Sequence, residues 1–334
     1  MGRYILRRIL VAIPILLGVT LLVFLMLHTA GGDPAVLRLG MQADEDSIAR
    51  VRAEMGIDRP LAVQYLDFLG SAVRGDLGRS YRSNAAVTDE VFARFPATVE
   101  LALAAMMIGT GIGLTAGVIA GVKRNSIFDY SSTLAALIGV SIPTFWLGII
   151  LIIMFGVWLE WLPISGRVNP RLGADPSQPF LVLSSLFQRN WVVFEDSVKH
   201  LILPAITLAG WPAAIIARIT RASVIEAMDG DYIRTARAKG LRDRFVVRRH
   251  ALPNAVIPVL TVIGLELGML LGGAVVTETV FSWPGVGKLA ADAVSARDYQ
   301  VTQGVVLLLA TVFVLLNLFV DILYAFVDPR VRYR

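Results

Sequence analysis

The feature that most constrains this sequence is its set of long apolar runs, because about 20 apolar residues cross a bilayer as one helix. Six runs qualify: residues 9–32, 101–122, 130–159, 201–217, 251–277 and 299–320, the last continuing past Asp321 to Phe326. Only 17% of the residues are charged, against about 25% in a typical soluble domain. We therefore predict an all-α polytopic membrane protein with six transmembrane helices, placed in the lipid bilayer.

The first run needs a separate argument, because a basic start followed by an apolar stretch also describes a signal peptide. The apolar part of a signal peptide has about 7–15 residues. The run from Ile9 to Gly32 is longer than that. We therefore predict that it is a retained transmembrane helix.

Basic residues mark one side of the predicted membrane. Arg and Lys precede run 1, separate run 2 from run 3 and run 4 from run 5, and follow run 6 (Arg3, Arg7, Arg8; Lys123, Arg124; 231–249; Arg330, Arg332, Arg334). The loops on the other side hold at least as many acidic residues as basic ones. Cytoplasmic loops carry the excess of Lys and Arg. Both termini are therefore expected in the cytoplasm, and the net charge of +5 is assigned to these loops, not to nucleic-acid binding.

The chain is expected to divide into three parts. They are a cytoplasmic N-terminus with span 1 (1–30), an outer, periplasmic helical segment (31–96) and a core with spans 2–6 and a cytoplasmic loop (97–334, with the loop at 222–253). Two short helices are predicted in the outer segment, one over 44–55 that stops at Gly56 and one that starts near Pro60. Residues 176–188 are too short to span and are expected near the outer surface.

A dense basic stretch, 231–249, lies between runs 4 and 5 and contains seven Arg and Lys. Each would cost about 3 kcal/mol at the centre of a bilayer, so the stretch lies outside it. Its apolar residues follow helical spacing, and Gly240 is expected to end this helix in the left-handed conformation. Asp243 is predicted to cap a second short helix over 244–250, with Pro253 in the first turn of span 5. The stretch is either a topology signal alone or a docking element for a soluble partner.

The order of motifs in this stretch resembles the coupling loop of ABC importer permeases. That pattern places Leu-Pro 12 and 13 residues after a glycine, and Gly240, Leu252 and Pro253 match it. The segment "DYIRTARAKGL" (231–241) is similar to the peptide-importer branch, although it lacks the acidic and alanine positions of the general pattern. The resemblance assigns ATPase coupling to ten positions: Asp231, Tyr232, Arg234, Thr235, Ala236, Arg237, Lys239, Gly240, Leu252 and Pro253.

The resemblance extends over nearly the whole chain. "RYILRRILVAIPILLGVTLLVF", "GGDP", "RGDLG", "KRNSIFDY", "SIPTFWLGI", "HLILPAITL" and "TETVFSWPGVG" all resemble the B-type permease subunits of dipeptide importers. It implies the fold of a type I ABC importer permease in a bacterial inner membrane. The implied partners are a second homologous permease, two ATP-binding subunits that carry ATP and Mg, and an extracytoplasmic solute-binding protein. The implied cargo is a dipeptide or short peptide, with oligopeptides, glutathione or nickel complexes as alternatives.

No catalytic or cofactor site is expected in this chain. "PGVGKL" (284–289) is similar to a phosphate loop, but Ser282 and Leu289 stand where that motif needs Gly and Ser or Thr. The three histidines (His28, His200, His250) are far apart and show no metal-ligand spacing, and the chain has no cysteine. The prediction is a transport subunit that is not an enzyme and binds neither a cofactor nor a metal.

Three acidic residues in or beside the spans are candidates for the substrate pathway, because such residues are costly in a membrane. Glu266 either lines the pathway or is a neutral acid at the interface of two permeases, and glycines beside it (Gly264, Gly268) permit close helix packing. Glu278 either contacts the outer loop or the binding protein, or is a solvated carboxylate. Asp321 either pairs with a nearby arginine or contacts substrate.

Two further features of span 4 are open to two interpretations. Pro204, Gly210 and Pro212 indicate either an irregular helix beside a pathway or ordinary kinks. Arg218 and Arg221 are predicted to anchor the span at the cytoplasmic face. A stand-alone secondary carrier is the main alternative from another class, but it would show an internal repeat, and we find none. A membrane enzyme would need converging catalytic residues.

Overall fold

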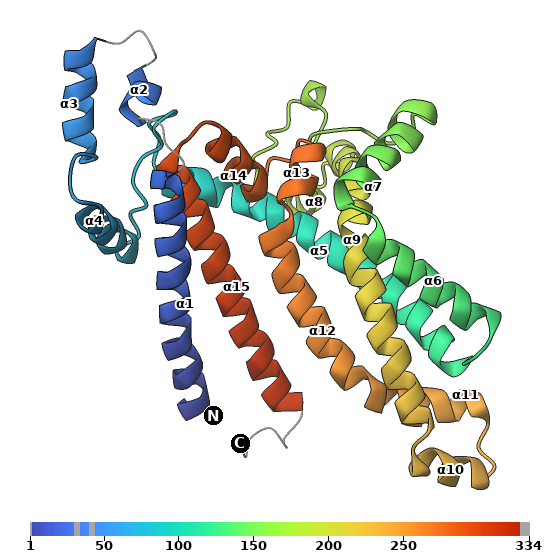
Figure 1. Ribbon diagram of the computed structural model, residues 1–334. Coiled ribbons are helices and arrows are strands. Elements are labelled where there is room, and N and C mark those ends of the chain that lie inside the picture. The colour runs from blue at the N-terminus through green and yellow to red at the C-terminus, as the bar shows by residue number, and fades with distance from the viewer. Residues whose placement is uncertain (1, 30–33, 40–43, 328–334) are drawn as a thin grey trace.

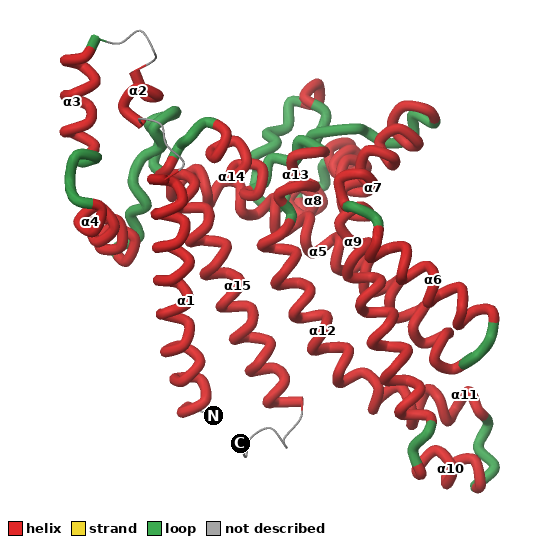
Figure 2. Tube along the Cα trace, in the orientation of Figure 1, coloured by secondary structure: helices red, strands yellow, loops and turns green. Residues whose placement is uncertain are grey.

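A computed structural model of the protein describes residues 2–29, 34–39 and 44–327, and within these ranges every named element is a helix (Figures 1 and 2). The helices that precede the third span are α1 (Gly2–Thr29), α2 (Pro34–Leu39), α3 (Glu45–Met55), α4 (Leu61–Val73) and α5 (Val87–Val122). They are followed by α6 (Ile127–Ser141), α7 (Thr144–Leu151), the π-helix η1 (Ile152–Trp158), the 3₁₀ turn η2 (Pro170–Leu172), α8 (Leu181–Phe187) and α9 (Trp191–Met228). The rest are α10 (Asp231–Ala238), α11 (Asp243–Val246), the π-turn η3 (Val247–Ala251), α12 (Leu252–Gly273), α13 (Val275–Val280), α14 (Val286–Ser295) and α15 (Tyr299–Val327).

Five helices of the described chain are long and apolar enough to cross a membrane. They lie in α1, α5, α9, the α11–α12 unit and α15. A sixth crossing is present if α6 and the α7–η1 pair form one span. The all-α fold is therefore confirmed, and the described helices give five to six candidate spans, of which the third is the bent one.

The third span was predicted as one helix over 130–159, and this was wrong because the helix breaks at Pro143. Ile142 is extended (φ −78°, ψ 124°), since the ring of a following proline disfavours the helical conformation. The axes on the two sides of the break differ by 102°. As a result α6 and α7 run in different directions, and α7 packs against α9 and α13 at the end opposite the chain termini (Figure 1).

Span 4 is a longer and more regular helix than expected. α9 runs without interruption from Trp191 to Met228 and includes both Pro204 and Pro212. The irregular-helix interpretation is therefore not supported, and the prolines are accommodated inside a continuous helix. The predicted span of 201–217 was too short because charged residues at both ends of α9 belong to the same helix.

Close packing of α5 against α9 forms the core of the bundle. Four glycines of α5, each four residues from the next, face α9: Gly109, Gly113, Gly117 and Gly121. A methyl group on Gly117 would lie 2.6 Å from the Ala217 carbonyl oxygen and on Gly113 2.8 Å from that of Ala213. Small residues at this spacing let two helix backbones approach, which is the usual way that membrane helices associate.

A second close approach joins α12 to α15. Gly264 faces Val320 of α15, and an added methyl group there would lie 2.5 Å from a Val320 methyl carbon. The prediction that the glycines beside Glu266 permit close helix packing is confirmed at this position. Gly268 lies next to Phe313 with more room, 3.5 Å from an added methyl group.

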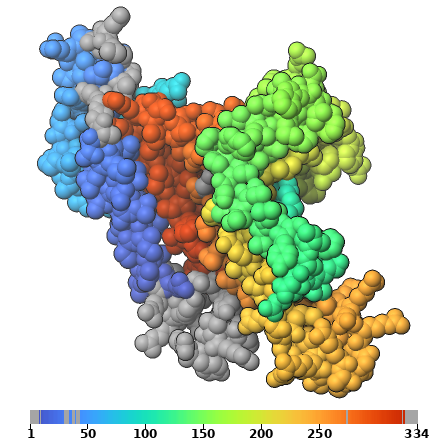
Figure 3. All heavy atoms as spheres, turned by 45° about the vertical axis from the view of Figure 1, so that its right-hand side comes forward, coloured from blue at the N-terminus to red at the C-terminus, as the bar shows by residue number. Residues whose placement is uncertain are grey.

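The bundle has two distinct ends (Figure 1). The basic end, as we call it, carries the start of α1, the turn between α5 and α6, the α10–α11 segment and the end of α15. The opposite end carries α2, α3, α8, α13 and α14. In the space-filling view the α10–α11 segment forms a separate lobe at the lower right (Figure 3). This arrangement matches the separation of basic and neutral loops in the sequence.

The helices of the outer segment form as predicted. Asp44 caps α3, its carboxylate accepting a hydrogen bond from the Ser47 N–H (3.0 Å), and Gly56 ends α3 in the left-handed conformation (φ 68°). α4 begins directly after Pro60. α2 was not predicted, and α5 begins at Val87, so it continues through the proposed segment boundary at residue 96. That three-part division stays a prediction.

Candidate functional site

The basic loop is held against the bundle by a small apolar core. Ile233 and Ala236 of α10 and Val246 of α11 are buried. They pack with residues from the ends of three long helices: Val118 of α5, Val224 and Ala227 of α9, and Ala255 of α12. The loop is therefore not a flexible connection, because its short helices share a core with the helices that cross the bundle.

The turn between α10 and α11 depends on Gly240. Its φ is +75°, a conformation that costs a residue with a side chain more than it costs glycine. Its N–H donates to the Arg237 carbonyl (2.9 Å), and the Leu241 N–H donates to that of Ala236 (3.4 Å). The predicted left-handed end of the first loop helix is confirmed.

The second loop helix differs from the prediction in its start. Asp243 is the first helical residue of α11, and the preceding Arg242 has the capping position without a side-chain hydrogen bond. The Asp243 carboxylate instead accepts a hydrogen bond from Arg237 across the turn (3.2 Å). The predicted cap by Asp243 was wrong because a cation on the neighbouring helix lies within reach of its carboxylate.

Pro253 lies at the point where the loop joins α12. A proline ring clashes with the carbonyl four residues earlier in a regular α-helix. The π-turn η3 precedes it, and the Leu252 N–H donates to the carbonyl of Val247, five residues back. Such a turn is wider than an α-helical one. The loop therefore continues directly into α12, with Pro253 near the first turn of the span as predicted.

The structure places the ten predicted coupling residues in two groups. Eight of them are exposed at the end of the loop or at its junction with α12 (Asp231, Tyr232, Arg234, Thr235, Arg237, Lys239, Gly240, Pro253). Ala236 is buried in the loop core and Leu252 is half-buried beside it, so both support the loop and do not form its surface. The assignment of these positions to ATPase coupling stays a prediction.

Two exposed apolar residues of this surface were not among the predicted positions. Leu241 and Phe245 follow the Gly240 turn and are 37% and 51% exposed, and Tyr232 lies on the same loop at 43%. Exposed aromatic and aliphatic side chains beside arginines are typical of protein interfaces. The sequence held a signal for them, because "LRDRF" places the two on either side of three consecutive charged residues.

An ion pair at the base of the loop joins α6 to α9. Both carboxylate oxygens of Asp129, near the start of α6, accept hydrogen bonds from the Arg221 guanidinium (2.5 and 2.9 Å). Asp129 also accepts one from the Asn125 N–H (3.0 Å). Arg221 was predicted to be a simple anchor at the membrane surface, which was wrong because a buried carboxylate binds it. Arg218, by contrast, is exposed.

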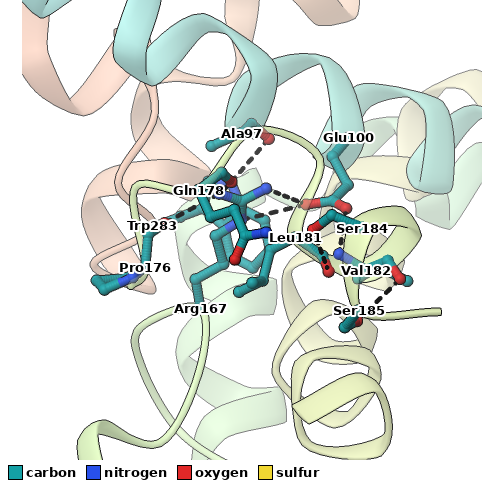
Figure 4. A network of polar contacts seen from close by, with 10 residues as sticks. All are labelled: Ala97, Glu100, Arg167, Pro176, Gln178, Leu181, Val182, Ser184, Ser185 and Trp283. Atoms are coloured by element: carbon teal, nitrogen blue, oxygen red, sulfur yellow. Dashed lines mark hydrogen bonds and ion pairs between the residues drawn. The ribbon is translucent and has the colours of Figure 1, made fainter. Parts of the chain in front are cut away.

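The opposite end of the bundle contains a buried cluster of polar groups around Arg167 (Figure 4). Arg167 is 1% exposed, and its guanidinium binds the Glu100 carboxylate of α5 through Nε (3.1 Å) and Nη2. Its Nη1 donates to the carbonyls of Pro176 (2.9 Å) and Gln178 (2.8 Å). One arginine thus fastens the long loop between η1 and α8 to the start of span 2.

Two further groups complete this cluster. The other oxygen of Glu100 accepts a hydrogen bond from the Val182 N–H at the start of α8 (2.8 Å). The Arg167 guanidinium lies 5.7 Å from the ring centre of Trp283, within the range of a cation–π contact. The Trp283 indole N–H donates to the carbonyl of Ala97 (2.9 Å). The polar partners of Arg167 and Glu100 are groups of the protein itself. The cluster therefore holds segments of the chain together and is not a reactive site.

Glu278 lies next to this cluster and caps α14. Its carboxylate accepts hydrogen bonds from the Thr98 hydroxyl (2.7 Å) and the Lys288 N–H (2.8 Å), while Thr98 Oγ accepts from the Val286 N–H (2.8 Å). Acceptors at a helix N-terminus satisfy its free N–H groups. Burial raises the pKa of Glu278 to about 7, against the opposing effect of these hydrogen bonds.

The interpretation of Glu278 as a solvated carboxylate was wrong, whereas its contact with the outer loop or the binding protein stays a prediction. Glu278 is fully buried, because α14 folds back over α13 and needs an acceptor for its first N–H groups. The "PGVG" stretch makes this possible, since a methyl group on Gly285 would lie 2.3 Å from a carboxylate oxygen of Glu278. The resemblance of this stretch to a phosphate loop thus has a different explanation, the cap of α14.

The other two acidic candidates have different outcomes. Glu266 is 4% exposed and shares a face of α12 with the buried Val259 and Leu270. Its Oε2 has no hydrogen-bond partner in the described part of the chain. The described structure therefore does not place it in an open pathway. Asp321 lies in α15, but its side chain is outside the described ones, so both of its predicted roles stay predictions.

The described residues contain no group of three or more His, Asp or Glu side chains that could hold a metal ion. The Nδ1 atoms of His28 and His200 each donate to a carbonyl oxygen four residues earlier in the same helix (2.8 Å in both cases), and His250 packs against Phe245.

The fold and the loop geometry define a class of protein: a polytopic membrane subunit with a firmly anchored basic loop at one end. Comparison with known families identifies which one. Residues 113–333 match the family "binding-protein-dependent transport system inner membrane component", and residues 1–102 match the N-terminal domain of the same components. The chain belongs to this family.

Relatives along the full length give a finer comparison. The chain is 47% identical over 332 residues to the di/tripeptide transport system permease protein DppB of Pseudomonas aeruginosa (99% of both chains). It is 46% identical to the dipeptide transport system permease protein DppB of Escherichia coli K12 (100% of both). It is 43% identical to the glutathione transport system permease protein GsiC of Escherichia coli O6:H1 (100% of both).

A solved structure supports the fold. The methionine ABC transporter MetNI in an inward-facing conformation matches with a TM-score of 0.53 and 19% identity, covering 70% of this chain and 93% of the other. At that identity the likeness concerns the fold alone. It confirms the expected type I importer permease fold.

Proposed function

We propose that this chain is one permease subunit of an ATP-driven importer that moves dipeptides or short peptides across a bacterial inner membrane. The observation that carries the proposal is the loop of residues 231–253, whose exposed charged and apolar surface is anchored to three transmembrane helices. The full-length similarity to di- and tripeptide permeases supports the choice of cargo. Both termini and the basic loop are on the cytoplasmic side in this proposal.

The partners follow from the same role. A second homologous permease completes the translocation pathway, two ATPase subunits bind ATP and Mg, and an extracytoplasmic solute-binding protein delivers the peptide. This chain is not an enzyme in the proposal and binds no cofactor. Its contribution to ATP use is a surface on which an ATPase docks, formed by Tyr232, Leu241 and Phe245 among exposed arginines.

The loop core explains how motion could pass from ATPase to membrane. Because Ile233 and Val246 pack against the ends of α5, α9 and α12, a displacement of the loop has to move these ends with it. The Asp129–Arg221 pair connects α6 to the same unit. Packed interfaces with two arrangements can transmit such a displacement over long distances. At the opposite end, the contacts of Arg167 keep the loop and the start of α5 in place while the helix ends at the basic end move.

Glutathione is the second candidate cargo, because a glutathione permease is 43% identical over the whole chain. Glutathione is itself a tripeptide derivative, so similar pathway chemistry would suit both. Longer peptides and nickel complexes stay alternatives within the family. A stand-alone carrier does not need an anchored docking loop.

Purification in a mild detergent followed by reconstitution tests the proposal. Mass spectrometry of the purified complex should find two ATPase subunits and a second permease. Vesicles that contain the complex and its binding protein should take up labelled dipeptide when ATP is present on the loop side. Recovery of the chain alone after cross-linking would contradict the proposed class. Uptake of glutathione but not of dipeptide would show that the cargo is glutathione.

A further inference from the structure

The short helix α4 has an inverted arrangement of polar and apolar side chains. Val63, Leu66, Gly70 and Val73 follow helical spacing along one face, and all four are exposed, Leu66 at 65% and Val73 at 88%. Water-soluble helices bury such a face. α4 exposes it, although the helix packs on the protein through its other side.

Two polar side chains of α4, Gln64 and Tyr65, contact α1 instead. The Tyr65 hydroxyl donates to the Leu17 carbonyl of α1 (2.9 Å) and lies 3.0 Å from the Thr20 hydroxyl. The Gln64 amide oxygen lies 3.1 Å from a ring nitrogen of His28. Polar groups turned inward and apolar groups turned outward are the pattern of a protein surface that contacts lipid, not water.

The contacts with α1 also give the depth of α4. The Tyr65 ring lies 5.4 Å from that of Phe24, which is five residues before the end of α1 at Thr29. At 1.5 Å per residue this level is about 8 Å below the helix end. Interfacial helices lie about 5–10 Å deep in the headgroup region. Figure 1 shows α4 beside α1, below its outer end, whereas α3 stands above it.

The start of α4 is also adapted to a place with little water. Gln64 Nε2 donates to the carbonyls of Ile57 (2.7 Å) and Arg59 (2.8 Å), which lie in the turn before the helix. Backbone groups within a bilayer need partners inside the protein. Arg59 and Asp67 form a salt bridge at 3.0 Å and are about 60% exposed, as residues at headgroup level can be.

We propose that α4 is embedded in the outer leaflet of the membrane, with its Val63–Leu66–Gly70–Val73 face against lipid acyl chains. α1 also exposes apolar side chains along its predicted span, with Leu22 at 57% and Met26 at 61%. Asp67 is the one charged side chain of α4, and it is paired with Arg59 at the edge of this face.

Spin labels on single cysteines test this proposal directly, because the chain has no cysteine of its own. The assembled complex, with cysteines of the other subunits replaced, is reconstituted in phosphatidylethanolamine–phosphatidylglycerol vesicles. A label is placed at Leu66→Cys and, in a second variant, at Val73→Cys. Leu22→Cys on α1 is the lipid control, and Ala49→Cys, exposed on α3, is the water control.

The ratio of collisions with oxygen to collisions with a water-soluble nickel chelate separates the outcomes. Both α4 labels should show a ratio severalfold above that of Ala49→Cys and similar to that of Leu22→Cys. Ratios equal to that of Ala49→Cys would overturn the proposal by placing α4 in water. Immobile labels that neither reagent reaches would overturn it by showing that a protein covers the face. If the complex with Leu66→Cys does not assemble, the label at Val73→Cys decides the result.

Discussion

Both ends of the bundle contain an arginine that binds a carboxylate, but the surroundings of the two pairs differ. At the basic end, Arg234 and Asp231 lie 3.3 Å apart with side chains 78% and 95% exposed. At the opposite end, the side chains of Arg167 and Glu100 are 1% and 6% exposed. An exposed pair contributes at most about 1 kcal/mol to stability. Losing one partner of a buried pair costs about 3–5 kcal/mol.

This difference indicates what each end is for. The exposed charges of the coupling loop cost little to rearrange, so they are available to another protein, while the buried residues below them keep the loop in place. The opposite end uses its charges internally, to hold a long loop and two short helices against α5 and α13. In the proposed function, the basic end is therefore the docking surface, and the opposite end is the part that stays fixed.

The largest expected effect is at Arg167. Arg167→Met leaves Glu100 buried without a cation and should lower the free energy of unfolding by about 3–5 kcal/mol. Denaturant or thermal unfolding of the purified complex, followed by tryptophan fluorescence, measures it. Arg234→Met at the basic end is the matched control and should change it by less than about 1 kcal/mol.

A double variant sharpens this prediction. Arg167→Met with Glu100→Leu removes both charges, and apolar replacement of a whole buried pair is close to neutral. It should recover most of the stability that the single variant loses. Equal losses in the single and double variants would show that packing, and not the ion pair, fastens the loop.

The second effect is the pH dependence from Glu278. Its pKa is raised to about 7 by burial, above the ordinary value of 4.5, so the folded state holds its proton more tightly than the unfolded state. This contribution to stability is complete below pH 4.5 and is lost as the pH rises through about 7. The total change is about 3 kcal/mol. Unfolding curves between pH 5 and pH 8 measure it.

Glu278→Gln is the control for that prediction, because it cannot titrate. The free energy of unfolding of this variant should lack the pH dependence that Glu278 contributes, whatever its value at a single pH. A variant with the same pH profile as the unaltered chain would show that another group titrates. At the basic end Asp231 and Asp243 are exposed, and the buried carboxylate of Asp129 has a cation, Arg221, as its partner.

The third effect is on the Gly240 turn. Gly240→Val should strain the backbone by about 1–3 kcal/mol, since its φ is positive and valine is β-branched. Open space surrounds the added side chain, so the effect is conformational and not steric. Peptide uptake and transport-stimulated ATPase activity should fall, while the amount of inserted chain stays the same.

Asparagine supplies the matched variant at this position, because it tolerates the left-handed conformation far better than valine. Gly240→Asn should keep most of the uptake. If the valine variant transports normally, the turn is not needed for coupling. If both variants fail equally, the glycine has a role other than its conformation.

The smallest effect is expected at Glu266. Its Oε2 lacks a hydrogen-bond partner within the described chain, and glutamine has nearly the same shape without a charge. Glu266→Gln should therefore change stability by less than about 1 kcal/mol and leave uptake unchanged across pH. Uptake assays in vesicles from pH 6 to 8 test this. Loss of uptake with intact assembly would show that the charge is required.

The features that could be predicted from the sequence are those that depend on neighbours in the chain. Apolar runs located the spans, and glycine and proline located the ends of α3, α10 and the start of α12. The bend at Pro143 had a local signal as well, the Ile-Pro pair, but the unbroken apolar run around it indicated one straight helix.

The buried polar contacts could not be predicted in this way. Arg167 and Glu100 are 67 positions apart, and Glu278 and Thr98 are 180 apart. Nothing in a single sequence says which of many charged residues will meet. The same limit explains the error at Arg221, whose partner Asp129 belongs to another helix. A carboxylate at the edge of an apolar run, such as Glu278, can be solvated or can cap a helix inside the protein, and the sequence does not tell which.

The most direct test of the central claim is a site-specific cross-link from the exposed surface of the basic loop. A photoreactive amino acid at Phe245 in the intact complex, irradiated in native membranes, should join this chain to an ATP-binding subunit. The same residue at Leu172, which is exposed at the opposite end, should not join that subunit. Cross-links from Phe245 to lipid alone, or to the same partner from both positions, would contradict the account.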